Sequence, residues 1–132
     1  MNAADPRYGD EVLRRLRDTP GAGDLPDGPG IARGRAGDRE QGAEVLFEFA
    51  VQADRIAEAR FRAFGCPHFL AGASWLTERL LGATRTDLLG WDWREAADAL
   101  TIPPAKFGRL LTLQDALRDA AGNWPGQTQS RV

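Results

Sequence analysis

Large apolar side chains occupy every second position of residues 45–51, and apolar residues alternate with charged ones over residues 57–63. This period of two predicts two half-buried β-strands. Only the short polar stretch 52–55 separates them, so an antiparallel hairpin is the simplest arrangement. The turn lacks the Asn-Gly pair that most strongly favours a hairpin.

On both sides of this strand pair the apolar residues recur at every third and fourth position, which is typical of amphipathic helices. Pro67 suits a first helical turn, Gly82 a helix end, and Asp92 a cap. The predicted helices span residues 8–18, 67–81, 86–89, 93–100 and 105–121.

Residues 19–38 contain three prolines and six glycines, a density that disfavours both helix and central strand. We expect a loop there, with an edge strand around residues 31–35, and a disordered tail after about residue 122. Residues 1–132 are therefore predicted to form a single α+β domain, in which a small antiparallel sheet packs against several helices.

The composition excludes several classes of site and partner for this chain. The 132 residues include one cysteine, one histidine and one lysine, which excludes a disulfide framework and a metal site of four Cys or His side chains from one chain. The net charge of −2 and the pI near 5.4 give no basic field for nucleic acid. No apolar run approaches the ~20 residues of a membrane span, and no signal-peptide pattern opens the chain, so a cytoplasmic protein without a membrane contact is expected.

Cys66 stands between Gly65 and Pro67, where the second strand gives way to the helix. A sulfur at a helix N-terminus faces unpaired backbone N–H groups, which suits a metal ligand or a sulfur acceptor; the alternative is a small buried hydrophobe. His68 could share an ion with Cys66 if Cys66 lies just outside the helix, and is otherwise an ordinary hydrogen-bonded or exposed histidine. Asp38 by itself is typical of a solvated turn.

An enzymatic role is not expected. Ser74 and Thr77 have no second histidine to serve as a base. Cys66 and His68 are two residues apart and point in different directions in a helical turn, so they make a poor catalytic dyad. The glycines of residues 21–30 do not lead from a strand into a helix, so they form no phosphate-binding loop.

Four segments follow one another in a distinctive order. They are Arg35-Ala36-Gly37-Asp38, residues 59–66 ending in Gly65-Cys66, residues 73–78 ending in Thr77-Glu78, and Ile102-Pro103-Pro104-Ala105-Lys106. Together they resemble the iron–sulfur cluster assembly scaffolds of the IscU and NifU N-terminal family. The resemblance covers residues 8–121. It implies an α+β fold with a three-stranded sheet, with a cysteine desulfurase and an Hsp70-type chaperone as partners.

Members of that family hold zinc or a nascent iron–sulfur cluster with three cysteines, an aspartate and, in many members, a histidine. Mapped onto this chain, the resemblance retains Cys66 and Asp38, while Ala36, Gly108 and Arg109 replace the other ligands. Binding of a cluster, iron or zinc is therefore expected to be weak or transient. His68 is not at a family ligand position and is a lesser candidate.

Arg109 would bring a fixed positive charge to the former ligand site. A guanidinium matches a carboxylate geometrically, so we predict an Asp38–Arg109 ion pair within reach of Cys66. Relative to the family, residues 39–42 lengthen the connection from Asp38 to the hairpin.

Residues Ile102 to Lys106 resemble the Leu-Pro-Pro-Val-Lys motif through which an Hsp70-type chaperone recognises the family. Two prolines pre-extend the backbone, which lowers the ordering entropy that a peptide groove must overcome. The single lysine of the chain falls at the motif's lysine position. The alternative is that Pro103 and Pro104 only separate two helices. Ala105 is smaller than the family's residue, which would weaken a groove contact by ~1 kcal/mol.

Two functional hypotheses follow from the resemblance. In the first, the protein is a divergent scaffold whose weak metal or cluster site, built on Cys66 and Asp38, is completed by a partner. In the second, it is a pseudo-scaffold that holds no metal and serves as a partner-binding or regulatory module for the desulfurase and chaperone machinery. The three lost ligands favour the second mechanism, while the first is the simpler inheritance of function.

Overall fold

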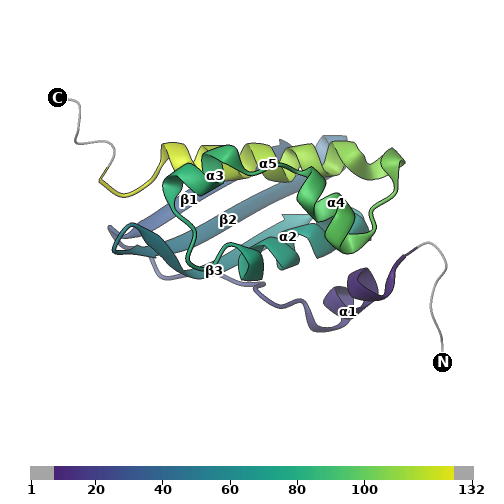
Figure 1. Cartoon of the computed structure of the whole chain (residues 1–132), viewed down its shortest axis with the longest axis horizontal. Helices are drawn as coiled ribbons and strands as arrows, with labels where there is room; N and C mark the ends of the chain where they lie inside the picture. The colour runs from purple at the N-terminus through teal and green to yellow at the C-terminus, as the bar shows by residue number, and fades with distance from the viewer. Residues whose placement is uncertain (1–7, 127–132) are drawn as a thin grey trace.

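Three antiparallel strands form the sheet of the computed structural model, which describes residues 8–126 (Figure 1). The strands, in spatial order, are β1 (Ile31–Asp38), β2 (Ala43–Gln52) and β3 (Arg55–Phe64). The predicted hairpin of β2 and β3 is confirmed. Its turn has φ angles of 53° at Ala53 and 61° at Asp54, the two positive values that a type I′ turn needs, so it closes without an Asn-Gly pair.

Five α-helices and two short 3₁₀ turns lie within the described residues. They are α1 (Asp10–Asp18), η1 (Arg39–Gln41), α2 (Pro67–Arg79), α3 (Arg85–Gly90), α4 (Arg94–Leu100), η2 (Pro104–Lys106) and α5 (Phe107–Gly122). The α+β class is as predicted. The last helix begins at Phe107 rather than Ala105, because Lys106 N–H bonds to the Pro103 carbonyl at 2.9 Å and closes a 3₁₀ turn first.

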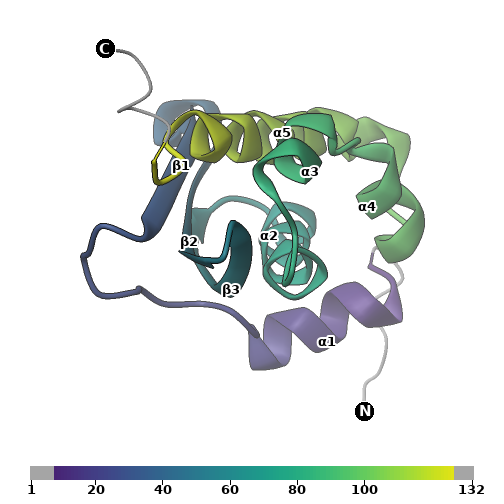
Figure 2. The same ribbon diagram turned by 60° about the vertical axis from the view of Figure 1, so that its left-hand side comes forward.

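The helices lie on one face of the sheet, with α5 over β1 and β2 and α2 along β3 (Figure 1 and Figure 2). Val45, Phe47 and Phe49 point from β2 into this layer and are fully buried. At Gly34 the backbone of α5 lies directly on β1. A Cβ there would overlap the Ala116 carbonyl oxygen, so a glycine is required for the helix to pack this closely.

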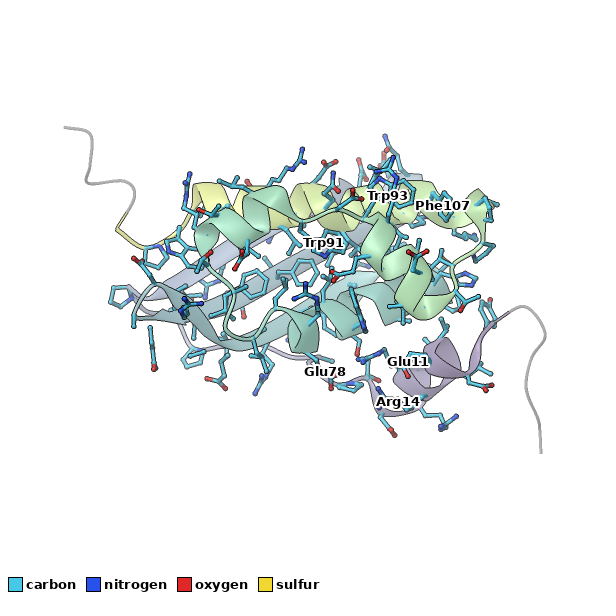
Figure 3. All side chains as sticks on the ribbon, in the orientation of Figure 1. Glu11, Arg14, Glu78, Trp91, Trp93 and Phe107 are labelled. Atoms are coloured by element: carbon cyan, nitrogen blue, oxygen red, sulfur yellow. The ribbon has the colours of Figure 1, made fainter. Side chains whose placement is uncertain are left out.

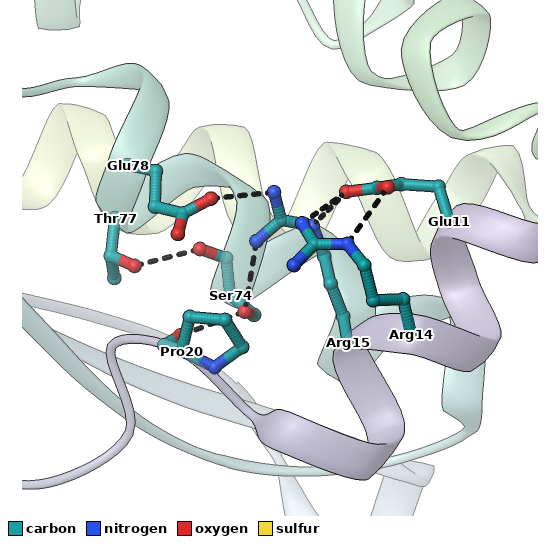
Figure 4. Close-up of polar contacts among 7 residues, drawn as sticks. All are labelled: Glu11, Arg14, Arg15, Pro20, Ser74, Thr77 and Glu78. Atoms are coloured by element: carbon teal, nitrogen blue, oxygen red, sulfur yellow. Dashed lines mark hydrogen bonds and ion pairs between the residues drawn. The ribbon is translucent and has the colours of Figure 1, made fainter.

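Helix α1 is held against α2 by one buried arginine (Figure 4). The side chain of Arg15 is only 4% exposed. Its guanidinium donates to Glu11 in its own helix at 2.7 Å, and to Ser74 and Glu78 of α2 at 3.1 and 2.6 Å. Ser74 in turn donates to the Pro20 carbonyl at 2.7 Å, so the same network fixes the start of the following loop.

The loop between α1 and β1 is tied across the outer face of the sheet. Residues 21–23 hydrogen-bond to the backbone of β3. These bonds cover the edge of β3 that does not pair with β2. Leu25 N–H donates to the buried carboxylate of Glu48 at 2.7 Å. Asp24 accepts from Arg62, and this hydrogen bond holds the pKa of the Asp24 carboxyl below its usual range.

The sequence predicts disorder after about residue 122, but the structure packs Trp124 against the fold. Trp124 is 1% exposed, and its indole N–H lies 3.4 Å from the Asp54 carboxylate in the hairpin turn. A large aromatic ring stabilises the fold by burial, and this ring covers the hairpin end of the core. The last six residues lie outside the described range. Between residues 8 and 126, no helix is long and apolar enough to cross a membrane.

Candidate functional site

Three segments that carry predicted site residues meet around Gly42 at one end of the sheet. Asp38 ends β1 directly opposite Ala43, the first residue of β2. A Cβ on Gly65, next to Cys66, would lie 3.4 Å from the Gly42 carbonyl oxygen, and a Cβ on Gly42 would lie 3.0 Å from Arg109 Nη2. The fold therefore brings the ends of β1 and β3 and the start of α5 to one place.

Cys66 is the N-cap residue of α2 and lies just outside the helix. Its backbone is extended (φ −71°, ψ 165°), and its carbonyl accepts from Leu70 N–H at 3.0 Å. The thiol is free and half-buried against the core. Gly65 is sterically required before it, because a Cβ there would lie 2.7 Å from the Phe69 ring. The cysteine is therefore held at a rigid, partly accessible junction.

His68 is buried in the first turn of α2, where it packs on the N-terminal segment. Its exposed fraction is 5%, and its ring lies 4.9 Å from that of Tyr8 at an angle of 52°. The imidazole thus takes part in holding the start of the described chain against α2.

Asp38 is exposed and caps the 3₁₀ turn η1. Its Oδ1 accepts from Glu40 N–H at 2.8 Å, a local bond typical of Asx turns. Gly42 ends the same turn in the left-handed conformation (φ 94°). Residues 39–42 therefore form a defined turn that uses the Asp38 carboxylate.

The predicted Asp38–Arg109 ion pair is wrong. Within residues 8–126, no ion pair joins these two side chains. Arg109 is half-buried against Gly42, and its Nη1 lies 3.4 Å from the Gln41 carbonyl. The carboxylate is satisfied by a neighbouring backbone N–H at little entropic cost, whereas the ion pair would have to order a long side chain at the surface.

The donor atoms near Cys66 do not complete a metal site from the described part of the chain. No group of three His, Cys, Asp or Glu side chains there is arranged to hold a metal ion. A closed zinc or cluster site needs about four good ligands, so the residues present do not fit a resident zinc or cluster without outside ligands.

The segment Ile102 to Lys106 joins α4 to α5 and is exposed at its centre. Ile102 is buried, while Pro103, Pro104 and Ala105 are exposed. The segment is followed by Phe107, whose ring lies 4.7 Å from that of Trp93 (Figure 3). Anchors at both ends thus hold the proline pair at the surface, where Pro103 is extended (φ −71°, ψ 150°) and Pro104 begins the 3₁₀ turn η2 instead of continuing the extended backbone.

The outer face of the sheet next to Cys66 carries side chains that the sequence did not single out. Arg35, Leu46 and Arg62 lie on one rung across the strands, and Glu44 pairs with Phe64 on the next. Together with Arg39 they line a hollow of about 250 Å³. The period of two puts Arg62 and Phe64 on one face of their strand, but the neighbours of that face depend on the strand register.

The order of β1-β2-β3 followed by covering helices, with Cys66 at the cap of the first of these helices, defines an α+β domain with a thiol at one end of its sheet. The chain belongs to the family described as NifU-like N terminal domain, whose model matches residues 7–131. The predicted family and fold are confirmed.

Known relatives agree with this assignment. Over 126 residues the chain is 32% identical to the nitrogen fixation protein NifU of Trichormus azollae. This match covers 90% of this chain and 42% of that protein. Over 83 residues it is 32% identical to the iron-sulfur cluster assembly protein IscU of Plasmodium falciparum, covering 63% of this chain and 51% of that protein. The chain thus spans about half or less of these relatives.

A solved structure has the same fold. The crystal structure described as a putative iron-sulfur cluster assembly scaffold protein for the SUF system, from Fervidobacterium islandicum, superposes with a TM-score of 0.68 over 90% of this chain and 99% of that one. The two sequences are 14% identical, so this likeness concerns the fold alone.

Proposed function

We propose that this protein is a divergent iron–sulfur cluster assembly scaffold, whose own chain supplies Cys66 and Asp38 and whose metal or cluster cargo is held only when a partner completes the coordination. The observation that carries the proposal is the position of Cys66. It is a free, partly accessible thiol at a rigid helix cap, in a chain that matches the scaffold family over nearly its whole length.

The incomplete donor set supports the partner-completed form of this function. A thiolate and a carboxylate leave about two positions of a tetrahedral site open, and a cysteine of another protein or a small thiol can fill them. Asp38 is exposed, so its second carboxylate oxygen is accessible to such a site beside the capping bond. Binding through two protein ligands is weak, which suits cargo that must leave again.

The partners proposed for this role are a cysteine desulfurase and an Hsp70-type chaperone. The relatives named for iron-sulfur cluster assembly and the exposed Pro103-Pro104 segment support this choice. The cytoplasmic location stays a prediction; one relative, from Schizosaccharomyces pombe, is named as mitochondrial.

Anaerobic reconstitution with ferrous iron, sulfide and an added small thiol tests the proposal. The native protein should develop visible thiolate-to-iron absorption and bind iron, and Cys66→Ser should abolish both. Asp38→Asn should weaken iron binding but keep the fold, since an amide oxygen still accepts the Glu40 N–H bond. A colourless native protein with far less than one iron per chain would contradict the scaffold function.

A second function, the metal-free pseudo-scaffold, is favoured by the surroundings of Arg109. Its guanidinium lies against Gly42, where the segments of Asp38 and Cys66 meet, and a fixed positive charge there disfavours a metal cation. In that case the fold would serve partner binding alone. A protein that stays colourless but still binds the desulfurase or the chaperone would establish this second function.

A further inference from the structure

The outer face of the sheet is positively charged just beside Cys66, in a chain whose net charge is −2. Arg35 on β1 and Arg62 on β3 flank Leu46 on the central strand. Side chains on one rung of a sheet point to the same face, and this face is opposite the one covered by α2 and α5. The two arginines therefore stand on either side of an apolar floor.

A third arginine closes the hollow from the turn η1. The guanidinium carbon of Arg39 lies 4.8 Å from the centre of the Phe64 ring, and its Nε lies 3.2 Å from Glu44. Phe64 is 43% exposed, which is unusual for a phenylalanine in a small domain. The stacking on Phe64 holds the Arg39 side chain over the hollow.

The charges in the hollow are not balanced. Of its three arginines, Arg39 pairs with Glu44, and Arg62 pairs with Asp24. Arg35 is exposed, and no carboxylate of the described residues lies within ion-pair distance of its side chain. A guanidinium has five N–H donors in a planar fork, so each of the paired arginines also keeps donors for a further carboxylate.

The spacing of the arginines favours a peptide over a small anion. Neighbouring strands lie about 4.8 Å apart, so the backbones of Arg35 and Arg62 are separated by about 10 Å, with Leu46 between them. One small anion would need donors that converge on a point. On an extended chain, carboxylates four residues apart (about 13 Å) point to the same face as an apolar side chain midway between them, which places the apolar side chain over Leu46 and the carboxylates within reach of the long arginine side chains on either side.

We propose that this hollow, lined by Arg35, Arg39, Leu46, Arg62 and Phe64, is a docking surface for an acidic segment of a partner protein that carries an apolar side chain between its carboxylates. Phe64 is two residues from Cys66, and Arg39 directly follows Asp38, so the bound segment lies beside the candidate site. The docking surface requires no metal at Cys66 and stands whether or not the scaffold function does.

Binding of a fluorescent peptide tests the proposal. The probe is Glu-Asp-Phe-Asp-Glu, and the control peptide is Gln-Asn-Phe-Asn-Gln. The acidic probe should bind the native protein and Cys66→Ser equally, bind more weakly at high salt, and outcompete the control. Arg35→Gln and Arg39→Gln should each weaken it about tenfold, the loss expected for one charged hydrogen-bonding group.

Arg118→Gln is the matched control, because Arg118 is exposed on α5, which covers the opposite face of the sheet. Its affinity for the probe should stay within about twofold of the native value. Arg35→Glu provides a test by charge reversal: it should lose the acidic probe and gain affinity for Lys-Lys-Phe-Lys-Lys. Thermal unfolding checks that each variant is folded.

Three results would overturn the proposal. The first is equal weakening by Arg118→Gln, which would mean diffuse attraction by the whole surface. The second is displacement of the probe by inorganic phosphate at concentrations as low as those of unlabelled peptide, which would mean a small-anion site. The third is self-association of the native protein that Arg35→Gln abolishes, which would assign the hollow to a second copy of this chain.

Discussion

Arg15 and Glu78 are joined by a 2.6 Å ion pair between Nη2 and Oε1, although they are 63 residues apart in the sequence. The contact joins a short N-terminal helix to the helix that begins at Cys66 (Figure 4). A nine-residue helix is marginal by itself in water, so α1 depends on this docking. The position of α1 is therefore held by this buried guanidinium together with the fully buried Val12.

Replacing this guanidinium should loosen the docking of α1. Arg15→Met keeps much of the apolar stem but leaves Ser74 and Glu78 without their donor, and we expect a loss of about 2 kcal/mol in the free energy of unfolding. Urea denaturation measures the loss, and faster hydrogen exchange in α1 locates it.

The neighbouring arginine provides the control for this variant. Arg14 pairs with Glu11 at the surface of α1. Surface pairs contribute little, so Arg14→Met should cost less than about 0.5 kcal/mol. Equal losses in the two variants would mean that the buried network does not hold the helix.

Restoring cysteines at the replaced ligand positions should restore tight metal binding. In Ala36→Cys/Arg109→Cys, two further thiolates would join Cys66 and Asp38 at the end of the sheet where their segments meet. We expect about one zinc per chain by metal analysis after dialysis, where the native protein retains little. The same double variant with Cys66→Ser should lose the metal again; retention there would place the zinc elsewhere.

Gly34 should not accept a side chain without a loss of stability. In Gly34→Ala the new Cβ would overlap the Ala116 carbonyl, and α5 would have to move off the strand. We expect a loss of about 1–3 kcal/mol in the free energy of unfolding by urea denaturation.

At a solvent-exposed glycine the same substitution should have the opposite effect on stability. Gly108 lies in the first turn of α5, and a Cβ there would meet no atom within 4 Å. Gly108→Ala should therefore stabilise the protein by about 0.5–1 kcal/mol, since alanine loses less entropy in a helix. A loss in Gly108→Ala as large as that in Gly34→Ala would exclude the close approach as the cause.

Acid should loosen the loop that crosses the outer face of the sheet. The hydrogen bond from Arg62 lowers the pKa of Asp24 in the folded protein below its usual value of 3.8. The stabilisation is therefore complete above that value and is lost as the pH falls through the lower, folded pKa. Asp24→Asn should show a flatter dependence of unfolding free energy on pH below about pH 4; curves of equal slope would contradict this role.

Much of the fold could be predicted from local patterns. The alternation in residues 45–63 predicted the hairpin, and the three- and four-residue spacing after Pro67 predicted α2, because each pattern reports which side of one element is buried. The burial of Trp124 escaped prediction. Its partner surface is the distant hairpin turn, and no periodicity in the last residues indicates that contact.

The candidate site was predicted only in part. The placement of Cys66 at a helix cap follows from the strand, the glycine and the proline around it. The contacts of Arg109 do not follow from its neighbours in the sequence. Whether its guanidinium meets the Asp38 carboxylate or the Gln41 carbonyl depends on the turn formed by residues 39–41. Nearby backbone donors compete with distant charges, and only the folded geometry decides between them.

By itself, the sequence determined the α+β class, most of the elements, the family and the loss of the ligand cysteines, because these depend on residue identity and on periodicities within single segments. Only the tertiary structure decided which side chains meet across segments: Arg15 with Glu78, Arg39 with Phe64, and Arg109 with the backbone around Gly42. Such contacts depend on strand register and helix packing, which arise from the burial of the whole core at once rather than from any one stretch of the chain.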